Sequence, residues 1–184
     1  MKIGIVGLGL IGGSLGLDFR ALGHEVWGVA RRSATCEAAL ACGAVDQAST
    51  GLASLRSTDV VFLCTPIHVI ETIATELVPY LTPSTVLTDV GSVKGAIVDA
   101  LSPRWPNFVG GHPMAGKSAV GIAVAEPQLF AHCAYVITPT DQTPPSAVAL
   151  LTELANSLHA NVFTCSPAVH DRAVAWISHL PVMV

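Results

Sequence analysis

Charged side chains are scarce in this chain: Asp, Glu, Lys and Arg make up only 12% of its 184 residues, and the net charge is −4. Without a basic excess, the chain has no electrostatic footprint for a phosphate backbone, which argues against a nucleic-acid partner. It also lacks an uninterrupted apolar run of the roughly 20 residues that cross a membrane, so we expect a soluble protein. Apolar residues are abundant instead, at 51%, and predict a large core that is buried on several sides.

Cysteines are too few and too irregularly spaced for a disulfide framework or a metal site. Their number is odd and no C-x-x-C pair occurs, while several fall within predicted strands or helices. We therefore expect free, buried thiols in a reducing cytoplasm and no bound metal. The five cysteines are Cys36, Cys42, Cys64, Cys133 and Cys165.

A glycine-rich turn, GLGLIG at residues 7–12, follows the first apolar run and has the spacing of a dinucleotide-binding fingerprint. Gly7 would make a tight turn, Gly9 would admit the phosphates, and Gly12 would let helix and strand pack closely. The turn could instead serve packing alone, and Lys2 before an apolar run could belong to a secretory signal. The flanking strand and helix, with no small-residue cleavage site, favour nucleotide binding at a helix N-terminus. The expected contact residues are Gly7, Gly9, Leu10, Ile11 and Gly12.

Strands and helices are predicted to alternate along the whole chain. With short connections, this alternation predicts an α/β fold: a doubly wound, mostly parallel sheet of the Rossmann type with right-handed crossovers. The longest irregular segment, about 112–133, is rich in Gly and Ala, and loops of this length are often functional. The predicted strands are 2–6, 25–30, 59–64, 85–90, 107–111, 134–138 and 160–165, and the predicted helices are 11–22, 33–42, 67–79, 93–101, 145–158 and 167–180.

No acidic residue follows the second predicted strand, where NAD-binding members of this fold hold the ribose 2′-hydroxyl. Arg31, Arg32, Ser33 and Thr35 occupy this place instead. Guanidinium groups pair with phosphate through charge-assisted, often bidentate hydrogen bonds. The two arginines could be ordinary solvated surface charges, but their position favours NADP as the cofactor.

Polar residues also follow three other predicted strands, at the edge where an open parallel sheet binds its ligands. Because these ends converge on one crevice, we expect the polar residues to lie within reach of a bound dinucleotide. Thr65 could instead cap the next helix. The polar residues are Thr65, Ser92, Lys94 and His112, and Pro66, which directly follows Thr65, is expected to lie at the same rim.

Four motifs lie along the chain in this order: GLGLIGGSLG at 7–16, DVGSVKG at 89–95, GGHPMAG at 110–116 and WISHLP at 176–181. In their order and spacing they resemble the prephenate and arogenate dehydrogenases of tyrosine biosynthesis. The resemblance covers the whole chain. The pair of GGHPMAG and ISHLP is far more specific than the glycine fingerprint.

The resemblance implies a helical second domain that dimerises and closes the active site, and that is absent here. Residues 1–165 would then form the NADP-binding domain, and 166–184 the start of a linking helix. Ser166-Pro167 is a favourable helix start, and the chain stops on apolar residues that a natural end would rarely expose. The resemblance thus implies a cytoplasmic homodimer with a small-molecule substrate.

The implied reaction is an oxidative decarboxylation, in which a cyclohexadienol gives its carbinol hydride to the nicotinamide, loses carbon dioxide and becomes a phenol. His112 would be the base, because an imidazole near neutral pKa accepts the hydroxyl proton at working pH. Ser92 would orient His112 or bond the same hydroxyl. His179 would reach a polar group of the substrate, and Lys94 would hold the cofactor or a carboxylate. The other residues of the substrate segment are Met114 and Gly116.

Each candidate has a structural alternative. The His112-Pro113 pair could form a turn, Ser92 could be a helix N-cap, and His179 could end a helix. The histidines outside the motifs are interpreted as surface or structural residues. They are His24, His68, His132, His159 and His170.

The substrate stays open between arogenate, which gives tyrosine, and prephenate, which gives 4-hydroxyphenylpyruvate. Many prephenate-using relatives carry a second histidine after the HLP run, where this chain has Val182. This departure, together with the arginine pair, favours arogenate. Two other functions remain: a β-hydroxyacid dehydrogenase and a non-catalytic NADP-binding module.

Overall fold

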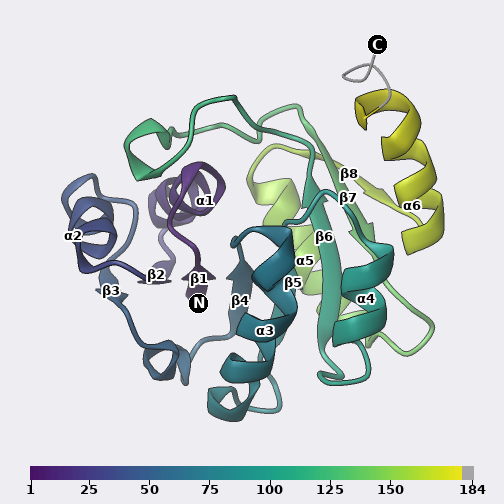
Figure 1. The fold of residues 1–184 in the computed structure, drawn as a ribbon, viewed down its shortest axis with the longest axis horizontal. Helices are drawn as coiled ribbons and strands as arrows, with labels where there is room; N and C mark the ends of the chain where they lie inside the picture. Colours follow the sequence, from purple (N-terminus) through teal and green to yellow (C-terminus); the bar gives the residue numbers. More distant parts are fainter. Residues whose placement is uncertain (180–184) are drawn as a thin grey trace.

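The computed structural model describes residues 1–179, apart from the side chains of Ser178 and His179. It shows an eight-stranded sheet with helices on both faces (Figure 1). The strand order is β3-β2-β1-β4-β5-β6-β7-β8. The strands are β1 (Lys2–Val6), β2 (Glu25–Val29), β3 (Gln47–Ser49), β4 (Val60–Leu63), β5 (Val86–Asp89), β6 (Phe108–Pro113), β7 (Ala134–Thr138) and β8 (Asn161–Thr164). The helices are α1 (Leu10–Ala21), α2 (Ser33–Ala41), α3 (Ile67–Leu77), α4 (Gly95–Leu101), α5 (Pro145–Ser157) and α6 (Pro167–Val174).

The first six strands in this order, β3-β2-β1-β4-β5-β6, run parallel to one another. Strand β7 runs antiparallel to β6, and β8 is parallel to β7. The connection from β6 to β7 contains only the short turn η3 (Ile122–Val124) and no helix that crosses to the other end of the sheet. Strand β7 therefore enters the sheet at the end where β6 leaves it. The doubly wound, mostly parallel α/β fold predicted from the sequence is confirmed.

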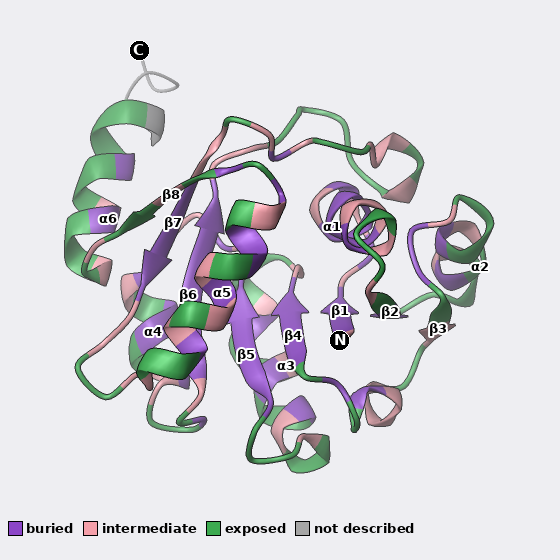
Figure 2. Cartoon of the chain, turned by 180° about the vertical axis from the view of Figure 1, so that it is seen from behind, coloured by how far each residue is buried: buried purple, intermediate pink, exposed green. Residues whose placement is uncertain are grey.

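Each face of the sheet carries its own apolar core, because successive strand residues point to opposite faces. In β4, for example, Val60 and Phe62 join a core with α1, α2 and α5, whereas Val61 and Leu63 join a core with α3 and α4. The strands in the middle of the sheet are buried throughout, as Figure 2 shows. This two-sided burial explains the high apolar content of the sequence.

Several predicted elements differ in detail. Strand β3 was missed, because three residues without an apolar run give no strand signal. The helix predicted over 167–180 is an α-helix, α6, only as far as Val174, and a π-helical turn, η4 (Ala175–His179), follows it. Of the five free cysteines, Cys36 is buried, Cys64, Cys133 and Cys165 are half-buried, and Cys42 is exposed, so the expectation of a buried thiol was wrong for Cys42. None of the helices within residues 1–179 is long and apolar enough to span a membrane.

The 114–133 loop passes over α1 (Figure 1). Two backbone amides of the loop bind side chains of the helix: Glu126 N donates to Ser14 Oγ at 3.0 Å and Gln128 N to Asp18 Oδ1 at 2.8 Å. A Cβ added at Gly13 would lie 2.5 Å from Ile122 Cδ1, so the glycine permits this close approach. The loop is thus fixed beside the helix that follows the glycine turn.

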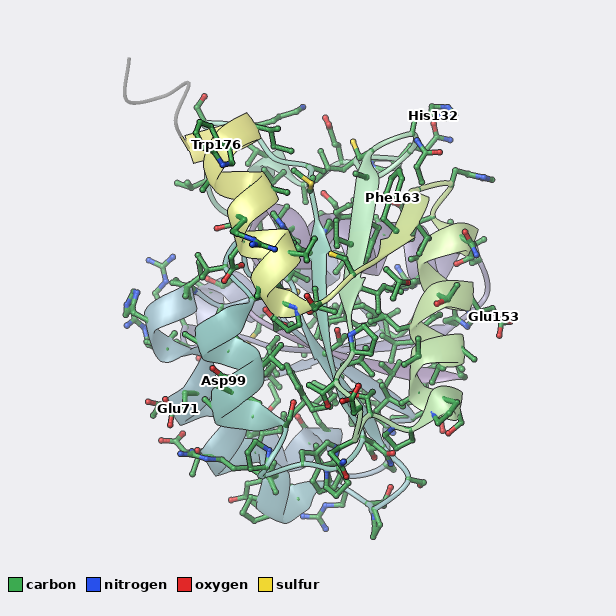
Figure 3. All side chains as sticks on the ribbon, turned by 90° about the vertical axis from the view of Figure 1, so that its right-hand side faces the viewer. Glu71, Asp99, His132, Glu153, Phe163 and Trp176 are labelled. Atoms are coloured by element: carbon green, nitrogen blue, oxygen red, sulfur yellow. The ribbon has the colours of Figure 1, made fainter. Side chains whose placement is uncertain are left out.

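The β8–α6 edge of the molecule exposes large apolar side chains. Trp176, in η4 directly after α6, is 71% exposed, and Phe163, on the last strand of the sheet, is 56% exposed. Both are labelled in Figure 3. Val182, on which the choice of substrate partly rested, lies outside the described residues, as does the side chain of His179.

Candidate active site

The glycine turn between β1 and α1 has the close contacts that its sequence predicts. Gly7 has a φ of +100°, and its amide donates to Val29 O at 2.8 Å. A Cβ at Gly12 would lie 2.1 Å from Gly7 O, whereas one at Gly9 would meet nothing within 4 Å. The turn is therefore tight on its inner side and open at Gly9. The first amides of α1 have no partner within their own helix, which suits an anion.

Thr65, after β4, lies directly beside this turn. A Cβ at Gly7 would come within 2.9 Å of Thr65 N. The Thr65 hydroxyl oxygen is buried and has no hydrogen-bond partner among the described residues. Helix α3 begins without a side-chain cap and with Pro66 as its N-cap, so the alternative that Thr65 caps this helix is wrong. A buried hydroxyl without a partner is unfavourable unless a ligand or water binds it.

The arginine pair stands at the end of β2. Arg31, Arg32 and Ser33 are exposed, and Thr35 is half-buried. Within the part of the chain that the structure describes, neither guanidinium forms an ion pair. Both charges are therefore available to a ligand at the start of α2.

Lys94, unlike the two arginines, is buried inside the protein. Its ammonium group is fully buried, donates to Gly111 O at 2.8 Å and forms an ion pair with Asp89 at the end of β5. Asp89 also accepts hydrogen bonds from Gly91 N at 2.8 Å and, at a longer 3.4 Å, from Gly111 N. Burial raises the pKa of the Asp89 carboxyl and lowers that of the Lys94 amine, and the attraction between them opposes both shifts. The placement gives Lys94 a structural task instead of the predicted ligand contact.

His112 is a strand residue, paired in register with Val136 of β7, so the alternative of a His112-Pro113 turn is wrong. Its side chain is 8% exposed. The His112 Nδ1 atom lies 2.8 Å from Nε2 of His170 on α6, with the rings nearly perpendicular at 73°. The imidazole is therefore held at the carboxyl end of β6 by a second imidazole.

Asp171 continues this row of side chains. Its Oδ1 lies 2.7 Å from His170 Nδ1 and accepts from Lys94 N at 2.7 Å, while Oδ2 accepts from Gly95 N at 2.8 Å. Burial opposes ionisation, but the two amides and His170 outweigh it and lower the pKa of Asp171. Asp171 thus ties α6 to the start of α4 as a carboxylate.

Ser92 lies half-buried in the β5–α4 loop, which Asp171 holds at its far end. Helix α4 begins at Gly95 with Lys94 as its N-cap, so the N-cap alternative for Ser92 is wrong. Further along, Met114 is half-buried, and Gly116 is exposed with open space around it.

His170 and Asp171 are the site residues that sequence reasoning missed. His170 was interpreted as surface or structural, yet it is 2% exposed and contacts His112 from 58 positions away along the chain. The one local signal is a histidine–aspartate pair in the first turns of a helix with a clear Ser166-Pro167 start. This pair indicates a site residue only once it is known that α6 packs beside the strand that carries His112.

In the strand order β1-β4-β5-β6, His112 and the glycine turn both lie at the carboxyl ends of parallel strands, three strand spacings or about 14 Å apart. A tight glycine turn, an open helix N-terminus and a buried imidazole pair on one edge define a Rossmann-type nucleotide-binding domain with a candidate catalytic base.

Comparison with known proteins identifies the family. Residues 15–164 match the family described as "Prephenate dehydrogenase, nucleotide-binding domain", and the chain belongs to this family. It is 34% identical over 187 residues to a prephenate dehydrogenase of Bacillus subtilis, covering 98% of this chain and 50% of that protein. It is 29% identical over 184 residues to a cyclohexadienyl dehydrogenase of Zymomonas mobilis, covering 97% and 63%.

Solved structures agree with this assignment. Arogenate dehydrogenase from Synechocystis is 49% identical, with a TM-score of 0.97 over 100% of this chain and 66% of that one. Prephenate dehydrogenase from A. aeolicus, in complex with hydroxyphenyl propionate and NAD+, is 31% identical, with a TM-score of 0.94 over 98% and 65%. The chain spans about half to two thirds of the length of these relatives.

Proposed function

We propose that this chain is the cofactor-binding and base-supplying part of an NADP-dependent arogenate dehydrogenase. The observation that carries the proposal is the position of the buried His112 imidazole on the same sheet edge as the glycine turn. The similarity to the arogenate dehydrogenase of Synechocystis supports the substrate. The relatives named as prephenate dehydrogenases keep prephenate as the second candidate.

The residues present fit a nicotinamide dinucleotide. Gly9 leaves open space over the first turn of α1, and the buried Thr65 hydroxyl beside it awaits a partner. Gly7, Gly12, Leu10 and Ile11 would hold the pyrophosphate through the backbone of the turn and the helix start. Pro66 shapes the rim. Bound there, the cofactor supplies the hydride acceptor for the carbinol carbon.

The exposed groups after β2 would select the phosphorylated cofactor. Arg31 and Arg32 carry two charges without ion-pair partners in the described chain, and Ser33 and Thr35 add hydroxyl donors. A 2′-phosphate would bind there through charge-assisted hydrogen bonds, which a ribose hydroxyl could not form as strongly.

His112 takes the proton of the substrate hydroxyl as the carbinol carbon loses its hydride and becomes a carbonyl carbon. The ring carboxylate then leaves as carbon dioxide, and its bonding electron pair passes through the ring to the carbonyl oxygen. The protonated His112 returns its proton to the resulting phenolate, so the base is regenerated. Ser92 would hydrogen-bond the same hydroxyl or His112. Met114, Gly116 and His179 would line the substrate side.

The proposal includes a second domain. Residues 1–165 would be the nucleotide-binding domain, and the segment that starts at Ser166 would lead into a helical domain that dimerises the cytoplasmic enzyme. The exposed Trp176 and Phe163 at the β8–α6 edge support a partner surface there.

The direct test follows NADPH formation at 340 nm with arogenate or prephenate, in this chain and in a longer form with the following domain. We expect turnover of arogenate with NADP in the longer form to exceed that of prephenate, and a small β-hydroxy acid to be inert. Binding of NADP without turnover of any of these substrates would leave only the non-catalytic module. A preference for prephenate would move the assignment to the second candidate.

A cofactor switch tests the arginine pair. Replacing Arg31 with Asp and Arg32 with Ala removes both phosphate partners and adds an acceptor for a ribose hydroxyl. We expect the ratio of the NADP to the NAD dissociation constant to rise by about 100-fold, since each charge-assisted bond contributes about 1.5–3 kcal/mol. Arg56→Ala, on an exposed turn away from the site, is the matched control. An unchanged ratio would refute the NADP assignment.

A further inference from the structure

Three side chains form a hydrogen-bonded row behind the candidate active site. His112 belongs to β6, and His170 and Asp171 belong to α6. The His112 Nδ1 to His170 Nε2 distance is 2.8 Å, and the His170 Nδ1 to Asp171 Oδ1 distance is 2.7 Å. His170 is 2% exposed and His112 8%, so water is kept from the contact between the two rings, whereas the Asp171 carboxylate is half-buried.

The protonation state of each ring follows from the far end of the row. The Asp171 carboxylate is only an acceptor, and it already accepts from the amides of Lys94 and Gly95. His170 must therefore carry a proton on Nδ1, and in the neutral form of this ring the lone pair lies on Nε2. The contact between the two rings then needs a donor, which is Nδ1–H of His112. The lone pair of His112 is left on Nε2.

We propose that His170, anchored by Asp171, is a positioning residue that holds His112 in its Nδ1–H tautomer, so that Nε2 is the atom that acts as the base. A free histidine side chain favours the opposite tautomer, in which Nε2 carries the proton and cannot accept another. The tautomer claim concerns this chain alone, while its catalytic consequence rests on the proposed function.

The same row stabilises the product of proton transfer. When Nε2 takes the substrate proton, His112 becomes a cation that donates Nδ1–H to His170, with the Asp171 carboxylate on the far side. A carboxylate hydrogen-bonded to an imidazole stabilises the imidazolium without itself becoming protonated, and here the half-buried Asp171 acts on His112 through His170. Among the side chains that the structure describes, the other charged or titratable groups around the row are Asp89 of β5 with Lys94 at the start of α4, a pair without net charge, and the half-buried Cys165 thiol before α6. Asp171 is therefore the group that supplies net negative charge.

The first test reads the tautomer directly, without cofactor or substrate. In the ¹⁵N-labelled chain, long-range proton–nitrogen correlation spectra at a pH where His112 is neutral should show its Nδ1 protonated and its Nε2 unprotonated. A scalar coupling between His112 Nδ1 and His170 Nε2 should report the hydrogen bond itself. A neutral His112 with its proton on Nε2 would overturn the proposal, whatever the enzyme turns over.

Variants separate positioning from packing. His170→Gln places an amide oxygen near the position of Nε2 and should keep the Nδ1–H tautomer, whereas His170→Leu removes the acceptor and should lose it. Val174→Ala, one turn later on the same helix and buried to a similar degree, is the matched control for destabilisation. In a preparation that turns over arogenate or prephenate, we expect His170→Leu to lower kcat by about 10-fold or more with the KM for the cofactor unchanged. His170→Gln should recover much of this loss.

The outcomes remain distinct from those of the proposed function. Loss of kcat in Val174→Ala equal to that in His170→Leu, or an unchanged tautomer in His170→Leu, would show that His170 only packs. Absence of turnover in the unaltered enzyme would instead contradict the proposed function, and the NMR result would still decide the tautomer.

Discussion

Replacing His112 with Asn should lower kcat by about 100-fold or more while the affinity for NADP stays within about twofold. The amide fills a similar space at the end of β6 but cannot take up the hydroxyl proton. The measurement is steady-state NADPH formation, with cofactor affinity from fluorescence titration. Because the base must be neutral, the kcat of the unaltered enzyme should fall as the pH drops through the pKa of His112.

A second histidine variant provides the control for this experiment. His68 is exposed on α3, so His68→Asn should retain full activity and the same pH profile. Activity of His112→Asn close to that of the unaltered enzyme would exclude His112 as the base. A flat profile at acidic pH would count against it as well, unless product release is shown to limit the rate.

Replacing Lys94 with Met should lower the free energy of unfolding by about 3–5 kcal/mol, because it leaves the Asp89 carboxyl buried without its cation. Methionine keeps most of the volume of the lysine chain, so the effect is electrostatic more than a matter of packing. The measurement is urea unfolding at neutral pH. The double variant Asp89→Asn/Lys94→Met should recover part of the loss, since the amide oxygen of an asparagine in place of Asp89 can still accept from Gly91 N.

The chain offers a matched control for this prediction too. The Lys117–Glu126 ion pair in the 114–133 loop is 47% and 40% exposed, and solvent screens such a pair. Lys117→Met should therefore change stability by less than about 1 kcal/mol. If both substitutions lowered the free energy of unfolding by the same amount, burial of the Asp89–Lys94 pair would make no difference to stability.

The sequence predicted the elements of the fold well where local signals were strong. The buried strands around 2–6 and 59–64 and the glycine turn after the first of them are continuous in the chain, so periodicity and spacing suffice. Strand β3 was not predicted, because Gln47–Ser49 is too short and has no apolar pattern. The antiparallel direction of β7 was not predicted, because it depends on the end of the sheet at which the 114–133 loop finishes, and no local sequence pattern indicates that.

The candidate site divides in the same way. The spacing of residues 7–12 indicates its role because all its contacts are local to one turn, and His112 stands out through the motif around it. Lys94 was expected to bind a ligand, but its buried contact with Asp89 depends on a loop that folds inward. His170 was overlooked because its contact with His112 joins a strand and a helix 58 residues apart.

The amino-acid sequence by itself determined the α/β alternation, the glycine turn and the imidazole at the end of the sixth strand, since each follows from apolar periodicity or from short-range steric demands. Only the tertiary structure decided the antiparallel entry of β7, the burial of the Asp89–Lys94 pair and the alignment of His112, His170 and Asp171. Those features depend on the packing of distant segments, because burial and hydrogen-bond partners are set by whatever element comes to lie alongside.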